Sequence, residues 1–167
     1  MEVSLRKISE ADTANIIRWR NSDDVRCWLY SQDDLTPEKH LGWLRNVVDK
    51  GRCAQYIIEV REGEALFDIG TTFIKRSIPD SEDGEFGIFI GESRARGKHC
   101  ALPATKEMVR IGFEELGLKK IYLTVFSANV PAVKTYLNVG FQITDEYHYE
   151  DDSQRMIYRM EISRDNL

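Results

Sequence analysis

The sequence is poor in cysteine and lacks long apolar runs, and each shortage excludes a class of protein. Its three cysteines, Cys27, Cys53 and Cys100, form no CxxC pair and lie near no pair of histidines. This scatter argues against a zinc site and against a disulfide framework. No apolar stretch approaches the roughly 20 residues that span a bilayer, and the N-terminal MEVSLRKISEAD lacks the apolar region of a signal peptide. We therefore expect a cytoplasmic protein with no metal site and no membrane partner.

Positive charge is also in deficit, because 23 lysines and arginines face 28 aspartates and glutamates, for a net charge of −5. A chain of this charge has no general attraction for nucleic acid, so nucleic acid is not an expected partner. Its 42% hydrophobic and 31% charged residues are ordinary for a globular protein. The sequence shows no repeat and no low-complexity tract, and we expect a single domain over residues 1–167.

Hydrophobic periodicity and turn signals predict a chain of mixed strands and helices. The predicted strands are residues 3–8, 53–60, 66–76, 85–91, 119–127, 141–149 and 154–162. The predicted helices are residues 11–21, 36–51, 101–116 and 129–140, and a polar connection is expected over residues 21–35. The third helix is apolar over a wide face, which is typical of a helix that packs against a sheet.

Capping residues mark the ends of these helices. Ser9 followed by Asp12 resembles a capping box, and Pro37 stands at the first position of the second helix. The Asn129 side chain is expected to cap the fourth helix, which Gly140 ends.

A basic loop, SRARGKHCA at residues 93–101, follows a predicted strand and precedes a predicted helix. It places Arg94, Arg96 and Lys98 around Gly97. Loop N–H groups and a helix N-terminus together attract anions, and the cations add charge-assisted hydrogen bonds. The loop therefore indicates a phosphate site, although each cation is alternatively part of a solvated basic rim.

Three segments in the C-terminal half resemble the GCN5-related N-acetyltransferase (GNAT) family. RARGKH matches the pyrophosphate loop Gln/Arg-x-x-Gly-x-Gly/Ala at its Arg and first Gly, and EFGIFI precedes it. NVPAVKTYLNVGF, residues 129–141, matches the pattern N-x-x-A-x-x-x-Y-x-x-x-G-F. The resemblance implies an α/β (α+β) fold. It has a mixed, mostly antiparallel sheet of about seven strands, helices on both faces and a cofactor cleft between splayed fourth and fifth strands.

The resemblance also implies acetyl-CoA as cosubstrate and no metal. A backbone N–H near Phe89 or Ile90 is expected to face the thioester carbonyl and stabilise an oxyanion, and Asn129 reaches toward the cofactor arm. The implied cofactor-binding residues are Phe89, Ile90, Arg94, Arg96, Gly97, Lys98, His99, Cys100, Ala101, Asn129 and Tyr136.

His99 departs from the family pattern, which has Gly or Ala at this position. The backbone there must come close to the pyrophosphate and expose its N–H. A residue other than glycine can still donate its N–H if its φ stays negative, so we expect pyrophosphate binding to survive at His99.

Catalytic roles follow from the same resemblance. Tyr136 occupies the position of the acid that protonates the leaving thiolate; the alternative is a packed aromatic. Glu85 is the candidate base, with a solvated carboxylate as the alternative. His40 is a rival base, or else a structural histidine. A Cys100 acyl-enzyme is disfavoured because GNAT transfer is usually direct.

The segment from residue 19 to residue 44, WRNSDDVRCWLYSQDDLTPEKHLGWL, resembles the amino-sugar-nucleotide N-acetyltransferases of the pseudaminic acid pathway. This implies direct attack by the 4-amino group of a UDP-linked amino-dideoxy sugar through a tetrahedral intermediate. The candidate acceptor contacts are Trp19, Arg20, Asn21, Arg26 and His40.

Two other functions remain open. One keeps the chemistry and takes a protein N-terminus as acceptor, which the acidic SIPDSEDGE loop would suit. The other is a non-catalytic acyl-CoA-binding module, altered at His99. The aromatic-rich terminal hairpin is a further candidate, as the edge of a homodimer.

Overall fold

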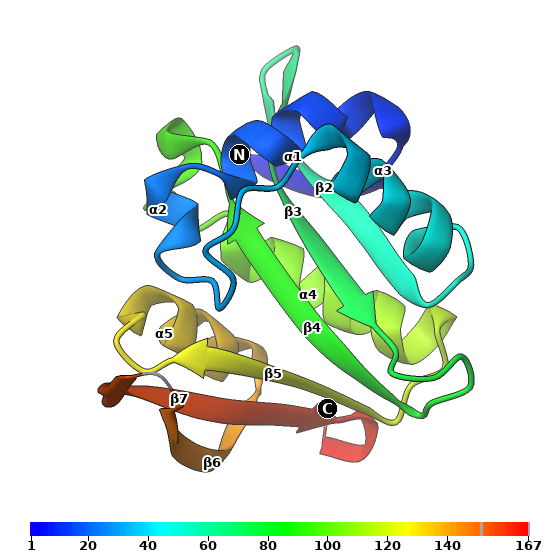
Figure 1. The fold of residues 1–167 in the computed structure, drawn as a ribbon. Coiled ribbons are helices and arrows are strands. Elements are labelled where there is room, and N and C mark those ends of the chain that lie inside the picture. Colours follow the sequence, from blue (N-terminus) through cyan, green and yellow to red (C-terminus); the bar gives the residue numbers. More distant parts are fainter. Residues whose placement is uncertain (151, 167) are drawn as a thin grey trace.

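The strands of this computed structural model, which describes residues 1–150 and 152–166, form one mixed sheet (Figure 1). The strands are β1 (Glu2–Lys7), β2 (Cys53–Glu62), β3 (Ala65–Lys75), β4 (Asp83–Ile90), β5 (Lys120–Phe126), β6 (Gln142–Tyr149) and β7 (Asp152–Ser163). Their order is β1-β2-β3-β4-β5-β7-β6, antiparallel except for the parallel pair β4–β5. The predicted α/β class and the mostly antiparallel seven-stranded sheet are confirmed.

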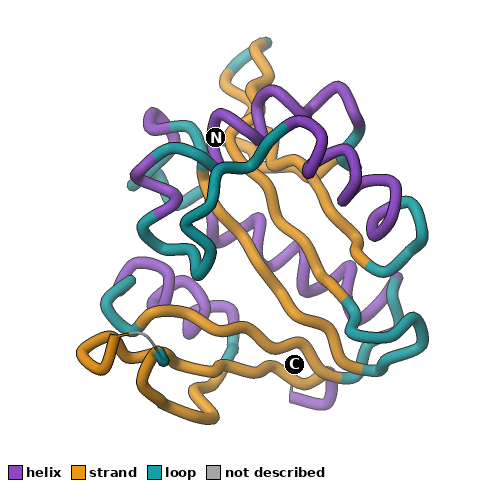
Figure 2. Tube along the Cα trace, in the orientation of Figure 1, coloured by secondary structure: helices purple, strands orange, loops and turns teal. Residues whose placement is uncertain are grey.

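The parallel pair β4–β5 holds together at one end only. Asp83–Glu85 pairs with Lys120–Tyr122, whereas β4 stays on β3 as far as Ile90 and β5 stays on β7 as far as Phe126. Beyond the paired residues the two strands diverge, as Figures 1 and 2 show. We call this opening the splay. It confirms the predicted splayed strands and leaves one edge of β4 without a strand partner.

Helices lie on both faces of the sheet (Figure 1). They are α1 (Thr13–Arg20), α2 (Asp23–Arg26), α3 (Pro37–Trp43), α4 (Ala101–Arg110) and α5 (Val130–Val139). Helices α1, α2 and α3 lie on one face, and α4 and α5 on the other. Helix α3 continues as a π-helical turn over Leu44–Val48, and α4 does so over Ile111–Glu115.

The larger core lies between the sheet and helices α4 and α5. Met108 of α4 and Val133 of α5 pack in one cluster with Ile121 and Leu123 of β5. A smaller cluster under α1 joins Ile16 and Trp19 to the sheet. Burying a side chain of this size contributes about 1.5–3 kcal/mol, so the two clusters hold both helical layers on the sheet.

The predicted caps are present in part. The Ser9 N–H donates to the Asp12 carboxylate at 2.8 Å, and Thr36 Oγ1 accepts from the Lys39 N–H at 3.3 Å. Gly140 ends α5 at φ 116°. The prediction for Asn129 is wrong in one respect, because it occupies the N-cap position but its side chain makes no capping hydrogen bond.

The sequence did not predict α2, which lies inside the expected polar connection over residues 21–35. Ser22 is its N-cap, and two aspartates fill its first turn, where the helix dipole favours negative charge. Val25 is its buried anchor. Within residues 1–150 and 152–166 no helix is long and apolar enough to cross a membrane.

Candidate active site

The loop between β4 and α4 is bound to its surroundings by Arg96. Its guanidinium donates to the carbonyl oxygens of Ile90 at 3.2 Å and Gly91 at 3.0 Å, and it forms an ion pair with Asp24 of α2. Arg96 therefore links the end of β4 to the opposite helical layer and sets the course of the loop.

Two residues of this loop are left-handed, Gly97 at φ 72° and His99 at φ 60°. The negative φ on which the expectation for His99 depended is therefore not found. A left-handed backbone suits glycine and strains a residue with a Cβ, so the loop is strained at His99. Among the described residues, the N–H groups of Gly97, His99 and Cys100 have no backbone acceptor. The loop therefore presents free donors beside the N-terminus of α4.

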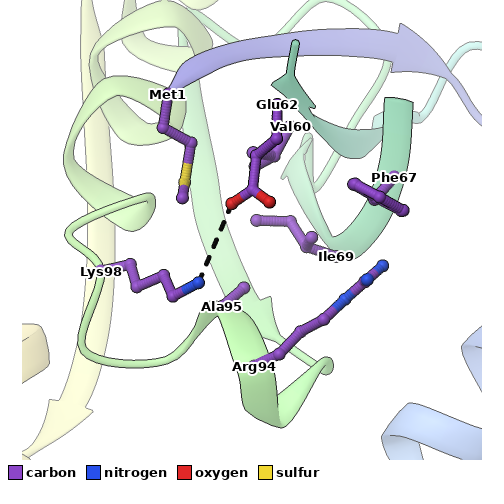
Figure 3. A pocket seen from close by; sticks show the side chains of 8 residues that line it. All are labelled: Met1, Val60, Glu62, Phe67, Ile69, Arg94, Ala95 and Lys98. Carbon is purple, nitrogen blue, oxygen red and sulfur yellow. Dashed lines mark ion pairs between the residues drawn. The ribbon is translucent and has the colours of Figure 1, made fainter. Parts of the chain in front are cut away.

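The remaining cations of the loop lie against the β2–β3 hairpin (Figure 3). The Arg94 guanidinium lies 4.0 Å from the centre of the Phe67 ring, and Lys98 Nζ lies 3.8 Å from the Glu62 carboxylate. Both side chains are exposed. Such exposed pairs contribute little, so these cations are free to turn toward a bound anion.

Cys100 precedes α4 with a buried side chain. Its Sγ lies 3.5 Å from Met1 Sδ, and burial raises the pKa of the thiol. A raised pKa disfavours the thiolate that an acyl-enzyme would need.

The splay opens directly beyond Glu85 and Tyr122, which face each other in the last parallel pair. Because side chains alternate along a strand, Glu85 and Phe89 share the face toward α1. The Gly91 N–H donates to Ile69 of β3. Successive N–H groups point to opposite edges, so the Ile90 N–H points to the open edge of β4. This geometry favours Ile90 over Phe89 as the oxyanion donor.

Tyr136 of α5 is buried against Phe86 of β4, with ring centroids 5.9 Å apart. Its hydroxyl has no hydrogen-bond partner within the described part of the chain. Burial raises the pKa of this phenol. The phenol therefore remains protonated and able to donate. Asn129, half-buried at the start of the same helix, leaves its amide uncommitted to capping.

Tyr30, which the sequence did not single out, joins the two sides of the splay. Its hydroxyl donates to Thr124 Oγ1 of β5 at 2.7 Å, and its ring stacks on that of Tyr149 with centroids 5.6 Å apart. Burial raises the pKa of Tyr30, and the negative charge of Glu85 adds to this effect. The signal in the sequence is an aromatic pair, Trp28 and Tyr30, inside a polar segment.

The predicted acceptor residues fall into two groups. Trp19 is buried and its Nε1 donates to Glu92 at 2.8 Å. Asn21 bonds both backbone groups of Leu35, at 2.9 and 2.8 Å, and Arg26 donates to the Asn21 carbonyl at 3.0 Å. These three side chains form hydrogen bonds that stabilise α1 and the loop that follows α2.

Arg20 and His40 form the second group, and both line a cavity of about 310 Å³ between α1, α3 and the sheet. His40 is 2% exposed, and burial lowers its pKa. It is therefore neutral at physiological pH. The structure brings Arg20 and His40 together from different helices.

Several proteins of known sequence are similar to this chain. An uncharacterised protein of Methanocaldococcus jannaschii is 23% identical over 155 residues, which are 89% of this chain and 31% of that protein. The L-amino acid N-acetyltransferase AaaT of Escherichia coli K12 is 28% identical over 107 residues, 64% of each protein. The chain thus spans less than two thirds of the length of these relatives.

Solved structures share the fold over nearly the whole chain. The spermidine N-acetyltransferase of Vibrio cholerae, crystallised with CoA and spermine, has a TM-score of 0.86 and 20% identity, covering 98% of this chain and 96% of that one. A domain from Methanocaldococcus jannaschii has a TM-score of 0.77 and 22% identity, covering 96% and 99%. At these identities the likeness shows the fold alone.

The sequence profile of the Acetyltransferase (GNAT) domain matches residues 2–142. This stretch runs from β1 into the start of β6 and includes the splay, the basic loop and α5. The chain therefore belongs to the GNAT acetyltransferase family.

Proposed function

We propose that this protein transfers the acetyl group of acetyl-CoA to a primary amine of a small molecule. The observation that carries the proposal is the splay, with a free β4 edge, a donor-rich loop at its outer end and the Tyr136 phenol beside it. Acetyl-CoA supplies an activated thioester, a pyrophosphate and an arm with amides, and each has a counterpart in this chain.

The position of each candidate residue suits one step of cofactor binding or catalysis. The N–H groups of Gly97, His99 and Cys100 bind the pyrophosphate, and the β4 edge bonds the pantetheine amides. The Ile90 N–H holds the charge that develops on the thioester oxygen. The remaining cofactor contacts proposed are Phe89, Arg94, Arg96, Lys98, Ala101 and Asn129.

Proton transfers complete the reaction. Glu85 lies where the splay opens and takes one proton of the attacking ammonium through water. Tyr136, kept protonated by burial, gives its proton to the departing thiolate, and the resulting phenolate takes up the second proton, which the nitrogen loses as the amide forms. His40 is the alternative base, although its place in the cavity between α1 and α3 suits acceptor binding better.

For the acceptor we propose the 4-amino group of a UDP-linked amino-dideoxy sugar. The support is the resemblance of residues 19–44, together with a buried guanidinium nitrogen of Arg20 that has no described partner. The relatives named for an L-amino acid and for spermidine give the competing acceptors.

The test follows CoA thiol release from acetyl-CoA with a panel of amines: the UDP-linked 4-amino sugar, L-amino acids, spermidine and N-terminal peptides. Turnover of the sugar nucleotide above the others supports the acceptor, whereas turnover of peptides alone supports the N-terminal alternative. Binding of acetyl-CoA without turnover of any amine supports the non-catalytic module. Glu85→Gln is expected to lower kcat/KM at least about 100-fold, as loss of a general base does.

A cytoplasmic location and a homodimer also remain proposals. Strand β6 is the last of the sheet, and it exposes Ile143 and Tyr147. Pairing of two β6 edges would satisfy the free backbone groups of this edge strand. Light scattering coupled to gel filtration measures the mass that decides between monomer and dimer.

A further inference from the structure

The cavity between α1, α3 and the sheet has an uneven polar lining. Its polar side chains are Arg20, Lys39, His40, Trp43, Gln55 and Thr71. No aspartate or glutamate is among the residues that line it. Arg20 and Lys39 therefore give the lining positive charge, whereas Asp33, the carboxylate whose charge acts on Arg20, lies outside the lining.

Part of this lining satisfies its own hydrogen bonds. Trp43 Nε1 donates to Gln55 Oε1 at 2.9 Å, and Gln55 Nε2 donates to Thr71 Oγ1 at 3.1 Å. Thr71 in turn donates to the Tyr56 carbonyl at 2.8 Å. These hydrogen bonds fix the orientation of the Trp43, Gln55 and Thr71 side chains.

Three buried polar side-chain atoms are without partners among the described residues: Arg26 Nε, and two that belong to residues lining this cavity, Arg20 Nη1 and His40 Nε2. The other terminal nitrogen of Arg20 donates to the Ser31 carbonyl at 3.1 Å, and Arg20 forms no ion pair with a described residue. Asp12, the carboxylate whose charge acts on His40, is already held by Arg6 at 2.7 Å. Buried polar atoms in proteins nearly always have partners, so this pair indicates a missing one.

The missing partner is best matched by an anionic oxygen. A guanidinium nitrogen only donates, and a neutral imidazole donates from Nε2 in one of its tautomers. A carboxylate or phosphate has several acceptor oxygens and carries negative charge, which the residues of this lining lack. An ammonium or a polyamine chain would instead meet the positive charge of Arg20 and Lys39 here.

The position of the cavity connects it to the reaction. Phe89 of β4 is part of its lining, and the next residue is Ile90, whose N–H points to the open edge of the splay. The remaining apolar wall comes from Ile16, Leu35 and Phe73. A volume of about 310 Å³ is at the small end of ligand pockets. It suits one anionic group with a short apolar body.

We propose that this cavity binds the anionic group of the acceptor through Arg20 and His40, and that the protein therefore selects amines that carry a carboxylate or phosphate. The inference rests on the proposed acetyl transfer and deepens it by naming the acceptor class. It excludes spermidine as a preferred acceptor, although a spermidine acetyltransferase shares the fold.

The test compares amines in matched pairs, with and without the negative group. An L-amino acid is paired with its amide, and the UDP-linked 4-amino sugar with the free 4-amino sugar. We expect kcat/KM to be at least about tenfold higher for the anionic member of one pair, since hydrogen bonds to charged groups are the strong ones. Preference in the first pair identifies a carboxylate, and preference in the second a phosphate. Equal rates within both pairs, or fastest turnover of spermidine, overturn the proposal.

Two variants test whether the preference for anionic amines comes from the cavity. Arg20→Gln is expected to bring the ratio within a pair close to one while the KM for acetyl-CoA stays unchanged. The matched control is Arg45→Gln, which removes the same charge from an exposed ion pair with Glu10 outside the cavity, and it should keep the ratio. A ratio that survives Arg20→Gln in a folded protein contradicts the assignment.

A binding measurement separates this proposal from the proposed function. The indole of Trp43 lies in the cavity wall, so its fluorescence reports occupancy without any turnover. Inorganic phosphate and acetate are the probes, acetamide is the neutral control, and Trp43→Phe identifies the signal. If no amine is acetylated but an anion still changes Trp43 fluorescence in an Arg20-dependent way, acetyl transfer fails and the anion site stands. If neither anion produces a signal that acetamide lacks, the anion site fails.

Discussion

The hydroxyl of Tyr30 donates a hydrogen bond of 2.7 Å to Thr124 Oγ1 of β5. Tyr30 belongs to the loop after α2, whereas Thr124 lies on the far side of the splay. Tyr149 Oη adds a second, longer contact of 3.4 Å to the Tyr30 carbonyl. The acceptor-side loop is thus tied to the strand that forms the opposite wall of the proposed site.

Removing this tie should loosen the acceptor side without disturbing the cofactor. A single hydrogen bond contributes about 0.5–1.5 kcal/mol, so Tyr30→Phe is expected to raise the acceptor KM by about two- to tenfold. The KM for acetyl-CoA should stay the same. A double-mutant cycle with Thr124→Val checks the cause, because the two effects should not add. Fully additive effects would show that the contact plays no part.

Tyr136→Phe should lower kcat at least about 100-fold if the phenol is the acid. Burial raises the pKa of Tyr136, so its proton is still present above about pH 10, where an ordinary tyrosine loses it. The wild-type kcat should therefore not decline between about pH 8 and pH 10 through this group. The control is Tyr158→Phe, which alters a tyrosine packed against the same core. A kcat that Tyr136→Phe leaves intact would exclude the role.

The left-handed backbone at His99 predicts a stabilising substitution. His99→Gly should raise the free energy of unfolding by about 0.5–1 kcal/mol, because glycine adopts this conformation without a Cβ penalty. Gly97→Ala is the converse test, since its new Cβ meets no atom within 4 Å and the cost is that of the backbone alone. Urea unfolding measures both. Opposite signs are expected, and a loss of stability in His99→Gly would contradict the argument.

The variant His99→Gly also tests how the loop binds the cofactor. If the loop N–H groups bind the pyrophosphate, His99→Gly keeps them in place and the KM for acetyl-CoA should stay level or fall. Isothermal titration with CoA measures the Kd of CoA, which should likewise stay level or fall.

The network around Asp12 predicts acid sensitivity. Burial acts to raise the pKa of Asp12, but hydrogen bonds from Arg6 and from the Ser9 N–H outweigh it and lower the pKa below its ordinary value. A lowered pKa means that the stabilisation is complete above about pH 4, the unfolded value, and is lost as the pH falls through the folded value. Asp12→Asn should cost about 1–3 kcal/mol at neutral pH and reduce the loss on acidification.

Urea unfolding at several pH values between about 6 and 3 follows the linkage. Asp80→Asn, in an exposed loop, is the matched control and should leave the pH dependence unchanged. If the free energy of unfolding of Asp12→Asn depends on pH as that of the wild type does, other carboxylates cause the acid sensitivity.

Local signals in the sequence determined much of the fold. Period-two and helical patterns predicted the strands of the sheet and its longer helices, because each element has to turn an apolar face to the core. The loop at residues 93–101 could be predicted as a phosphate site because such a loop needs donors at fixed backbone positions. Helix α2 was missed, because one buried side chain, Val25, gives too short a pattern to read.

Contacts between distant segments were decided by the tertiary structure alone. Arg20 and His40 lie on different helices, and only the packing of α1 and α3 on the sheet leaves both with an unpartnered atom at one cavity. Tyr30 and Thr124 are 94 residues apart, and no local pattern pairs them. The backbone at His99 is likewise set by its surroundings, since Arg96 holds the loop to β4 and α2 and the chain must turn left-handed to enter α4. The sequence by itself therefore determined the family and predicted a cofactor loop, whereas the proposed acceptor side depends on which side chains the folded layers leave unpaired.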